Sequence, residues 1–349
     1  MHFPCQYFIY NCGKKTSMLE MDYESRLILR ELCMNSRAPA SELAGKLKRS
    51  RSIVASRAEF LEKELGVKYV PEFDERKLGF LYPCIIQVNL KKAVDEKTVN
   101  DLCSFSPVPQ FVAACRGGFD LLIYATAKSN VEYLRWEYQF RSKLRDTIER
   151  WRPSQVVIQR LGFFPLQPIA LQNSDLPDVQ KKLLLELNKD TRLSYRELGE
   201  KTGLGLAKSR YNLGLLEKSG IIKRFTAVMQ KPPAKVHIVY FSSYKYQEGF
   251  ENRCITARKL ITSEEKLQPC NNYAYVTELS GHADEVAWAS FDDVVEGYDR
   301  IAKEEKVFEP DEMRNESAVV TRVVYGKWPI RSIDTQEVYD TSSWEELRE

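Results

Sequence analysis

The sequence has no apolar run near the 18 or so residues that a membrane-spanning helix needs. Its opening residues lack the basic start and the unbroken apolar stretch of a signal peptide. We therefore expect no membrane partner and a cytoplasmic location. Residues 1–20 are expected to be an N-terminal extension, to which we assign no function.

Residues that build metal and catalytic sites are also scarce. The chain has only three histidines, and its eight cysteines are scattered without a C-x-x-C pair. Such cysteines are typical of reduced, mostly buried thiols in an intracellular protein. No P-loop, G-x-G-x-x-G, H-E-x-x-H or Ser/His/Asp arrangement is present. The sequence therefore predicts no metal site, no cofactor and no enzyme.

Charge of one sign is not in large excess either. The chain has 52 Lys and Arg against 49 Asp and Glu, and 43% of its residues are hydrophobic. Only local clustering of charge can therefore indicate a partner. The length allows two or three compact domains, each with its own core.

What the chain does contain is an internal repeat. The segment from Arg37 to Val67 recurs, altered, as Arg192 to Ile221, and the same offset aligns Leu61-Glu62-Lys63 with Leu216-Glu217-Lys218. A unit this long, present twice, indicates two fused copies of one module rather than a solenoid.

Each copy begins with three short helical patterns. In the first copy, apolar residues recur at helical spacing over 22–34, 40–47 and 50–65, with Ser50 as the expected N-cap of the third helix. From Gly66, the segment K-Y-V-P-E-F-D-E-R-K-L-G predicts an extended piece and a turn that form a small wing. The second copy repeats the helices over 179–188, 195–201 and 206–219.

The period then changes to that of strands alternating with helices. The first copy predicts strands at 84–90, 111–115, 119–126 and 155–161, and helices at 97–105 and 131–148. The second predicts strands at 236–243, 273–279, 285–290 and 317–325, and helices at 250–261 and 294–302. The order β-α-β-β-α-β is that of the ferredoxin-like fold, one antiparallel sheet with two helices on one face.

The expected fold class is α+β, with two winged helix-turn-helix domains alternating with two ferredoxin-like domains. A proline-containing linker interrupts both periods between the copies. The predicted divisions are 1–20 (extension), 21–80 (first winged helix-turn-helix), 81–162 (first ferredoxin-like domain), 163–177 (linker), 178–232 (second winged helix-turn-helix), 233–326 (second ferredoxin-like domain) and 327–349 (polar tail).

The candidate site is a basic turn at the start of the third helix. No acidic residue occurs between Lys46 and Arg57, although the flanks are rich in glutamate. A helix that enters the major groove needs long donors for bases and phosphates at its opening turns, and small hydroxyls that let the backbone approach. The alternative is an ordinary solvated helix face. We predict that double-stranded DNA is contacted by Lys46, Lys48, Arg49, Ser50, Arg51, Ser52 and Arg57.

The second copy carries a weaker version of this pattern, with Lys201, Lys208 and Arg210 around the corresponding turn. Gly205 stands where the first copy has Ser50, and Asn212 replaces Arg57. Two interpretations remain open: this head binds phosphates without reading bases, or it serves mainly as a spacer.

These features resemble the Lrp/AsnC family of feast-famine transcription regulators. The resemblance rests on Asp22 to Leu32, Arg37, Glu42-Leu43, Ser50, Arg57, Leu61-Glu62 and the β-α-β-β-α-β module, and it covers Met21 to about Tyr325, twice. It implies a winged helix-turn-helix joined to a ferredoxin-like domain that dimerises and senses small molecules, often amino acids. We therefore expect an archaeal-type, sequence-specific transcription regulator whose two regulatory domains pair as an intramolecular pseudo-dimer, with further homo-oligomerisation.

The resemblance also implies an effector site. In the family, a Gly-x-Asp-like turn between the second and third strands lies near the effector pocket. Gly118-Phe119-Asp120 resembles it, and Gly281-His282-Ala283-Asp284 is one residue longer. Gly118, Asp120, Gly281 and Asp284 are thus the predicted effector contacts, with backbone N–H groups available to a carboxylate. The structural alternative is a pair of hairpin turns that require glycine.

One enzymatic alternative remains. Siroheme decarboxylases resemble Lrp/AsnC proteins in both domains, some are fusions of this length and order, and they are thought to use histidines and arginines for a tetrapyrrole carboxylate. Here His237 and His282 are the only histidines beyond His2, and the W-P-Y-N-like segment of these enzymes is not evident. The matching helix carries Arg135, Trp136, Arg141 and Arg145, which are more simply explained by packing on a sheet.

Overall fold

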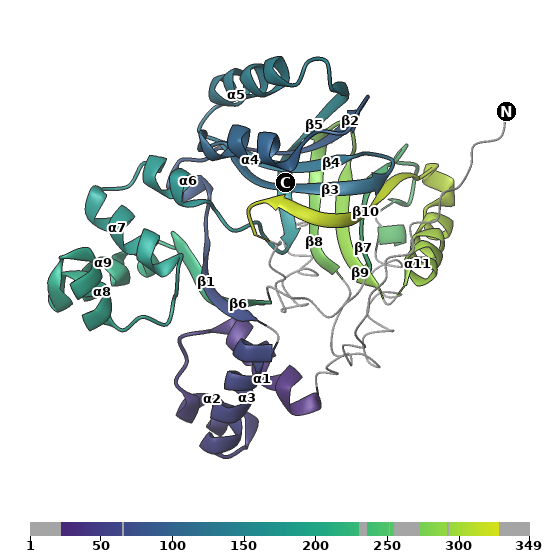
Figure 1. Cartoon of the computed structure of the whole chain (residues 1–349). Coiled ribbons are helices and arrows are strands. Elements are labelled where there is room, and N and C mark those ends of the chain that lie inside the picture. The colour runs from purple at the N-terminus through teal and green to yellow at the C-terminus, as the bar shows by residue number, and fades with distance from the viewer. Residues whose placement is uncertain are drawn as a thin grey trace.

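Two helical heads and a β-barrel make up the chain (Figure 1). The computed structural model describes residues 22–64, 66–229, 236–250, 252–254, 273–291 and 293–327. The N-terminal extension, most of the helix expected at 250–261 and the tail beyond Lys327 lie outside the described residues. Within the described part, no helix has the length and apolarity needed to cross a bilayer.

The first head consists of α1 (Tyr23–Met34), α2 (Ala40–Leu47) and α3 (Arg51–Glu64). Capping side chains set where α1 and α3 begin: Asp22 accepts a hydrogen bond from the Ser25 N–H at 2.8 Å, and Ser50 accepts one from the Ile53 N–H at 3.2 Å. The expected N-cap at Ser50 is confirmed. Between α2 and α3 the chain turns through Lys48, which has a left-handed backbone with φ of 53°.

The second head consists of α7 (Asp178–Leu187), α8 (Tyr195–Thr202) and α9 (Gly205–Lys218). Ser194 and Glu197 form a reciprocal capping box at the start of α8. The segment expected to be an irregular linker contains a further helix, α6 (Pro168–Asn173). Proline suits the first turn of a helix, and the buried Ala170 and Leu171 join the core of the second head.

A two-stranded antiparallel ribbon joins the heads. It pairs β1 (Val67–Phe73) with β6 (Ile222–Met229), so the expectation that β1 forms a small wing with its own turn is wrong. Six of the seven β1 residues are buried. The backbone N–H and C=O groups of a buried strand need a second strand as hydrogen-bond partner, and the short turn after β1 does not provide one. At the centre of the ladder Val70 faces Thr226 and Pro71 faces Phe225. These are equivalent positions of the repeat with their partners exchanged, so the heads are related by a local two-fold axis.

The barrel contains eight strands in the closed order β10-β3-β4-β2-β5-β8-β9-β7. Each half has the ferredoxin-like arrangement, and the pairs β5 with β8 and β10 with β3 close the two sheets on each other. The halves of one chain therefore pair as the pseudo-dimer that the sequence predicts. The strands are β2 (Tyr82–Leu90), β3 (Pro109–Gly117), β4 (Leu121–Ala127), β5 (Ile148–Leu161), β7 (Val236–Ser243), β8 (Tyr273–Gly281), β9 (Glu285–Phe291) and β10 (Arg314–Tyr325).

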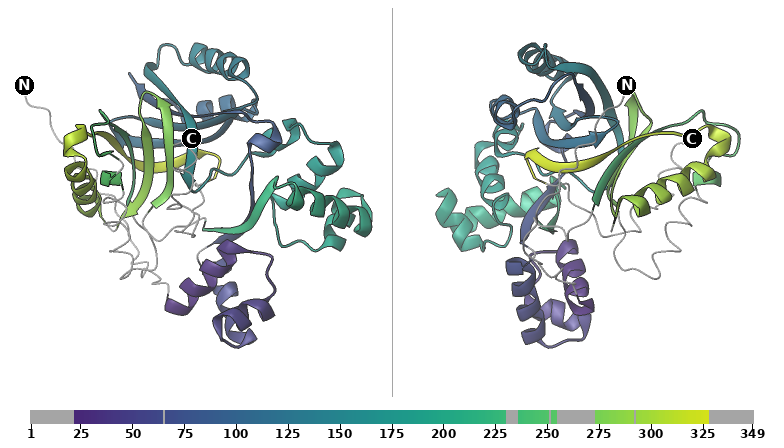
Figure 2. Two further views of the ribbon diagram at one scale, coloured as in Figure 1. Left: turned by 180° about the vertical axis from the view of Figure 1, so that it is seen from behind. Right: turned by 45° about the vertical axis from the view of Figure 1, so that its right-hand side comes forward.

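Apolar side chains from both halves fill the barrel interior. Phe111 of the first half and Trp288 of the second meet edge-on, with ring centroids 5.6 Å apart. Outside the barrel, α4 (Glu96–Ser104) and α5 (Asn130–Lys143) cover the first sheet, and α11 (Val294–Val307) covers the second (Figure 2). α5 ends earlier than expected and β5 begins earlier, because the ladder with β2 continues back to Ile148.

A short helical turn connects the ribbon to the barrel. This turn, η1 (Arg76–Leu78), follows Glu75, whose carboxylate reaches the barrel interior and accepts the Tyr124 hydroxyl at 2.8 Å to each oxygen. Burial raises the pKa of Glu75, and the Tyr124 hydrogen bond opposes that rise. The connection between head and barrel is thus anchored by an enclosed carboxyl group.

Candidate nucleic-acid interface

The outer surface of α3 begins with small and basic side chains. Val54 and Leu61 are 1% and 0% exposed and face the core of the head, which leaves the opposite side of the helix in solvent. Arg51, Ser52 and Ser56 are exposed on that side. The helix therefore presents donors at its surface, with the partly exposed Ile53 beside them.

Three of the five predicted basic contacts are held by carboxylates of the same head. Arg49 makes a bidentate ion pair with Glu24 of α1, with contacts of 2.7 to 3.0 Å. Arg57 pairs with Asp22 at 2.8 Å, and Lys46 pairs with Glu42 at 3.1 Å. The hydrogen bond from Arg49 lowers the pKa of Glu24, so this carboxylate stays charged. Arg49 and Arg57 thus tie α1 to the basic turn and to α3.

Lys48 and Arg51 differ from these three. Both side chains are exposed, and neither makes an ion pair with a described residue. Lys48 lies at the left-handed turn before α3, and Arg51 is the first residue of α3. Ser50 between them uses its hydroxyl to cap the helix. Lys48 and Arg51 therefore place two positive charges without a described ion-pair partner at one turn.

In the second head the three predicted cations are exposed, but the helix that carries two of them is different. Lys201, Lys208 and Arg210 make no ion pair with a described residue. Along α9, however, Leu206 is 57% exposed and Tyr211 is 67% exposed. The outer face of α9 is thus more apolar than that of α3.

The two heads contact each other through residues that the repeat alone does not identify as interface residues. Ser36 and Thr191, which occupy equivalent positions of the repeat, share a hydrogen bond of 2.9 Å. Arg37 donates to the Thr191 carbonyl at 2.5 Å and lies 5.1 Å over the Phe225 ring. Arg192 pairs with Glu62 at 2.8 Å. The aligned arginines that reveal the repeat are therefore interface residues, which their spacing alone does not indicate.

The predicted effector residues lie at two equivalent hairpins at one end of the barrel. Asp120 accepts a hydrogen bond from the Leu90 N–H at 2.8 Å, and Asp284 accepts one from the Tyr244 N–H at 2.9 Å. A Cβ on Gly118 would lie 2.5 Å from Glu316, and one on Gly281 would lie 2.9 Å from the Pro153 carbonyl. Both carboxylates fasten their hairpins, and both glycines allow close packing.

A charged network lies between these hairpins, and the sequence does not suggest it. Arg152 of β5 makes a bidentate ion pair with Glu316 of β10, one contact being 2.8 Å, and donates to Asn89 at 2.9 Å. His282 lies 3.1 Å from the same guanidinium. Burial and the Arg152 charge lower the pKa of His282. The ion pair joins the two halves of the barrel, so its partners are far apart in the sequence.

The residues considered for binding a tetrapyrrole carboxylate do not lie together at one site. His237 lies 2.8 Å from Ser290 near one end of β7, whereas Ser242 at the other end is hydrogen-bonded to Asp284 in the hairpin of His282. The stretch from His237 to Ser242 spans about 17 Å of strand. On α5, Trp136 is buried against the outer face of the first sheet.

Comparisons with known proteins agree with this architecture. Residues 176–223 match the family described as winged helix-turn-helix DNA-binding. The HTH-type transcriptional regulator FL11 of Pyrococcus furiosus is 34% identical over 74 residues, which are 21% of this chain and 49% of that protein. The proline dehydrogenase transcriptional activator of Rhodobacter capsulatus is 30% identical over 118 residues, 32% of this chain and 75% of that protein. The chain thus spans about half the length of the first of these relatives.

Among solved structures, the siroheme decarboxylase NirDL has a similar fold over most of this chain. The TM-score is 0.58 with 13% sequence identity, over 93% of this chain and 100% of that one. At this identity the likeness concerns the fold. It matches the order of two heads and two barrel halves seen here.

Proposed function

The chain belongs to the Lrp/AsnC family of transcription regulators, and from that premise we propose that its first head reads a specific sequence in double-stranded DNA. The observation that carries the proposal is the pair of exposed cations Lys48 and Arg51 at the start of α3, which make no ion pair with a described residue. Helix-turn-helix proteins place the start of this helix against base edges. Arg51 is the proposed base or phosphate contact, Lys48 a phosphate contact, and Ser52 a short hydrogen-bonding group.

The other predicted contacts take a different role in this proposal. Arg49 and Arg57 hold α1 against the basic turn and α3 through Glu24 and Asp22, and so position the reading helix. In the second head, Lys201, Lys208 and Arg210 contribute positive charge next to an apolar face. Because the heads differ, the preferred DNA site is asymmetric, with half-sites separated by about 10 base pairs or a multiple of that spacing.

The test compares the variant Lys48→Ala/Arg51→Ala with wild type in gel-shift titrations on DNA selected by the wild-type protein. Lys63→Ala is the matched control, since Lys63 is an exposed cation at the far end of the same helix and pairs with Glu59. We expect the double variant to lose selective binding and the control to keep it. Equal affinities of wild type and double variant would contradict the proposal.

For the effector, we propose a small carboxylate such as an amino acid that binds beside Gly118, Asp120, Gly281 and Asp284. Arg152 supports this, because its side chain lies between the two hairpins, is 15% exposed, and can exchange Glu316 for an incoming carboxylate as its partner. Calorimetric titration with single amino acids tests the idea. If amino acids still bind to Arg152→Ala, the proposed effector site is wrong. DNA binding by the same variant without amino acid is measured separately, because it tests the first head and not the effector site.

A second candidate function, siroheme decarboxylation, is favoured by one observation, the likeness to NirDL over most of the chain. The separation of His237 from His282 along β7 speaks against a joint role for them at one tetrapyrrole carboxylate. Incubation with siroheme under reducing, anaerobic conditions distinguishes the two functions. A Soret band on the protein and release of carbon dioxide would favour the enzyme, and their absence would remove it.

A further inference from the structure

The outward face of α9 is apolar at positions where α3 is polar. The repeat aligns Leu206 with Arg51 and Tyr211 with Ser56. Leu206 and Tyr211 are more than half exposed, so neither side chain packs in the core of the head. A helix that reads bases needs donors and acceptors at these positions. Exposed apolar side chains grouped on one face are instead typical of a surface that binds another polypeptide.

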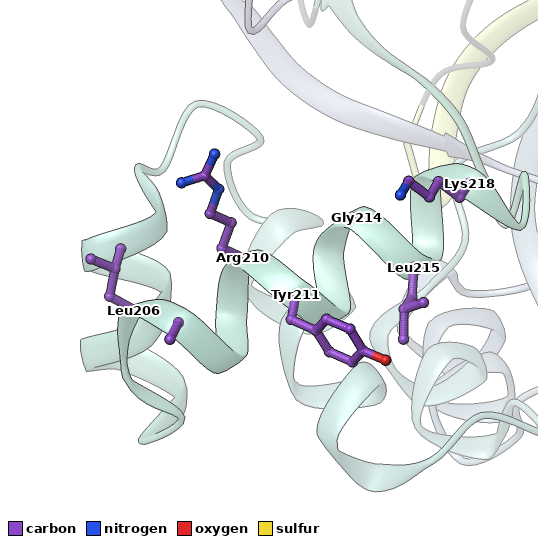
Figure 3. Close-up of a pocket in the computed structure, with 7 residues that line it drawn as sticks. Leu206, Arg210, Tyr211, Gly214, Leu215 and Lys218 are labelled. Atoms are coloured by element: carbon purple, nitrogen blue, oxygen red, sulfur yellow. The ribbon is translucent and has the colours of Figure 1, made fainter.

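This face is hollowed into a groove of about 530 Å³ (Figure 3). Gly214 leaves its middle open, because a Cβ there would meet no atom within 4 Å. A glycine inside an exposed helix costs about 1 kcal/mol relative to alanine, and here no neighbour requires it. The groove is lined by Leu206, Ala207, Arg210, Tyr211, Gly214, Leu215 and Lys218.

The positive charge along the groove indicates which kind of segment can bind there. Arg210 and Lys218 lie along the groove, both are exposed, and no acidic residue lines it. Neither cation makes an ion pair with a described residue. A complementary segment therefore needs apolar side chains for the groove and carboxylates for its rim.

We propose that the occupant is the segment 335–349 of this same chain. It contains five carboxylates and one guanidinium, so it has the charge that the groove lacks. Ser343 followed by Glu346 is the sequence signature of a helix start, and it would place Trp344 and Leu347 three residues apart on one helix face. An aromatic and an aliphatic anchor at this spacing are the usual way in which a short helix fills an apolar groove.

The described chain also ends within reach of the groove. Close to its end, a Cβ on Gly326 would lie 3.2 Å from the side-chain nitrogen of Gln167, which directly precedes α6 of the second head. When fully extended, the chain from Lys327 to Trp344 spans about 55 Å. This is more than twice the length of α9, which is about 21 Å. A docked segment would cover α9 and leave α3 as the helix that reads bases.

Hydrogen exchange on the full chain tests the proposal, with α3 as an internal reference. In Trp344→Ala/Leu347→Ala, we expect the amides of α9 to exchange about tenfold faster than in wild type, while those of α3 do not change. Arg210→Glu/Lys218→Glu should have the same effect. Adding Glu345→Lys/Glu346→Lys to that variant should restore protection, which loss of apolar packing alone would not allow.

Two outcomes would overturn the proposal. One is equal exchange of α9 in wild type and in Trp344→Ala/Leu347→Ala. The other is protection that rises with protein concentration, because that would assign the groove to a segment of a second copy rather than to the same chain. Circular dichroism of each variant confirms that the heads remain folded, and DNA binding by the first head is measured separately.

Discussion

Arg49 and Arg51 are neighbours on the same basic turn, yet the structure predicts opposite consequences for their loss. Arg51 is exposed and has no ion pair with a described residue, whereas the Nε and Nη2 groups of Arg49 both donate to the Glu24 carboxylate at 2.7 to 3.0 Å. An arginine that is already paired with a carboxylate of the protein releases no counterion from DNA unless this ion pair breaks on binding. The two substitutions should therefore differ most in the salt dependence of binding.

The size of the effect follows from counterion release. Each phosphate contact contributes about 0.9 to the slope of the logarithm of the binding constant against the logarithm of salt concentration. Arg51→Ala should lower the slope by about that amount and weaken binding by about 1 to 3 kcal/mol if the side chain reaches a base. Arg49→Ala should leave the slope unchanged. Glu24→Gln, which frees Arg49, should raise it by up to about 0.9.

Fluorescence anisotropy with one labelled DNA site at several salt concentrations measures all four proteins. Because Arg49→Ala and Glu24→Gln both break the pair that ties α1 to the basic turn, circular dichroism of each variant checks that the head remains folded. The reasoning is refuted if Arg49→Ala lowers the slope as much as Arg51→Ala does, or if Glu24→Gln has no effect on it.

Two further predictions concern the barrel. Trp288→Ala should lower the free energy of unfolding by about 3 to 5 kcal/mol, and a double-mutant cycle with Phe111→Ala should give a coupling of about 0.5 to 1.5 kcal/mol across the two halves, both measured by denaturant titration; strictly additive losses would contradict the shared interior. Because the pKa of Glu75 is raised above 4.5 in the folded state, the folded protein binds the proton more tightly than the unfolded chain, so stability falls as pH rises from 4.5 to the folded pKa. Glu75→Gln should remove this decline in thermal melts from pH 4 to 8, and an unchanged pH profile would contradict the enclosed carboxyl group.

The features that the sequence predicts well are those set by local periodicity. Helical spacing through Val54 and Leu61 locates α3 within a residue or two, and the changes of period locate the barrel strands. These patterns record which side of each element is buried, and burial here agrees with the pattern.

The features that were missed depend on contacts between distant segments. The sequence predicts a local wing at β1, but the partner of this strand is β6 of the other head. The acid-free segment from Lys46 to Arg57 appears uncompensated in the sequence, yet Asp22 and Glu24 come from α1 and neutralise two of its arginines. Likewise, Arg152 and Glu316 meet only because the two sheets close into one barrel. No local pattern carries this information, since each pair is formed by tertiary packing.

We propose that α3 of the first head gives this chain selective affinity for DNA. The most direct measurement is a gel shift on DNA from the region upstream of its own coding sequence, in the presence of excess non-specific DNA. We expect a shifted band that non-specific DNA does not remove and that Lys48→Ala/Arg51→Ala abolishes. A band that non-specific DNA removes as readily as specific DNA, or that the double variant keeps at full strength, would contradict it.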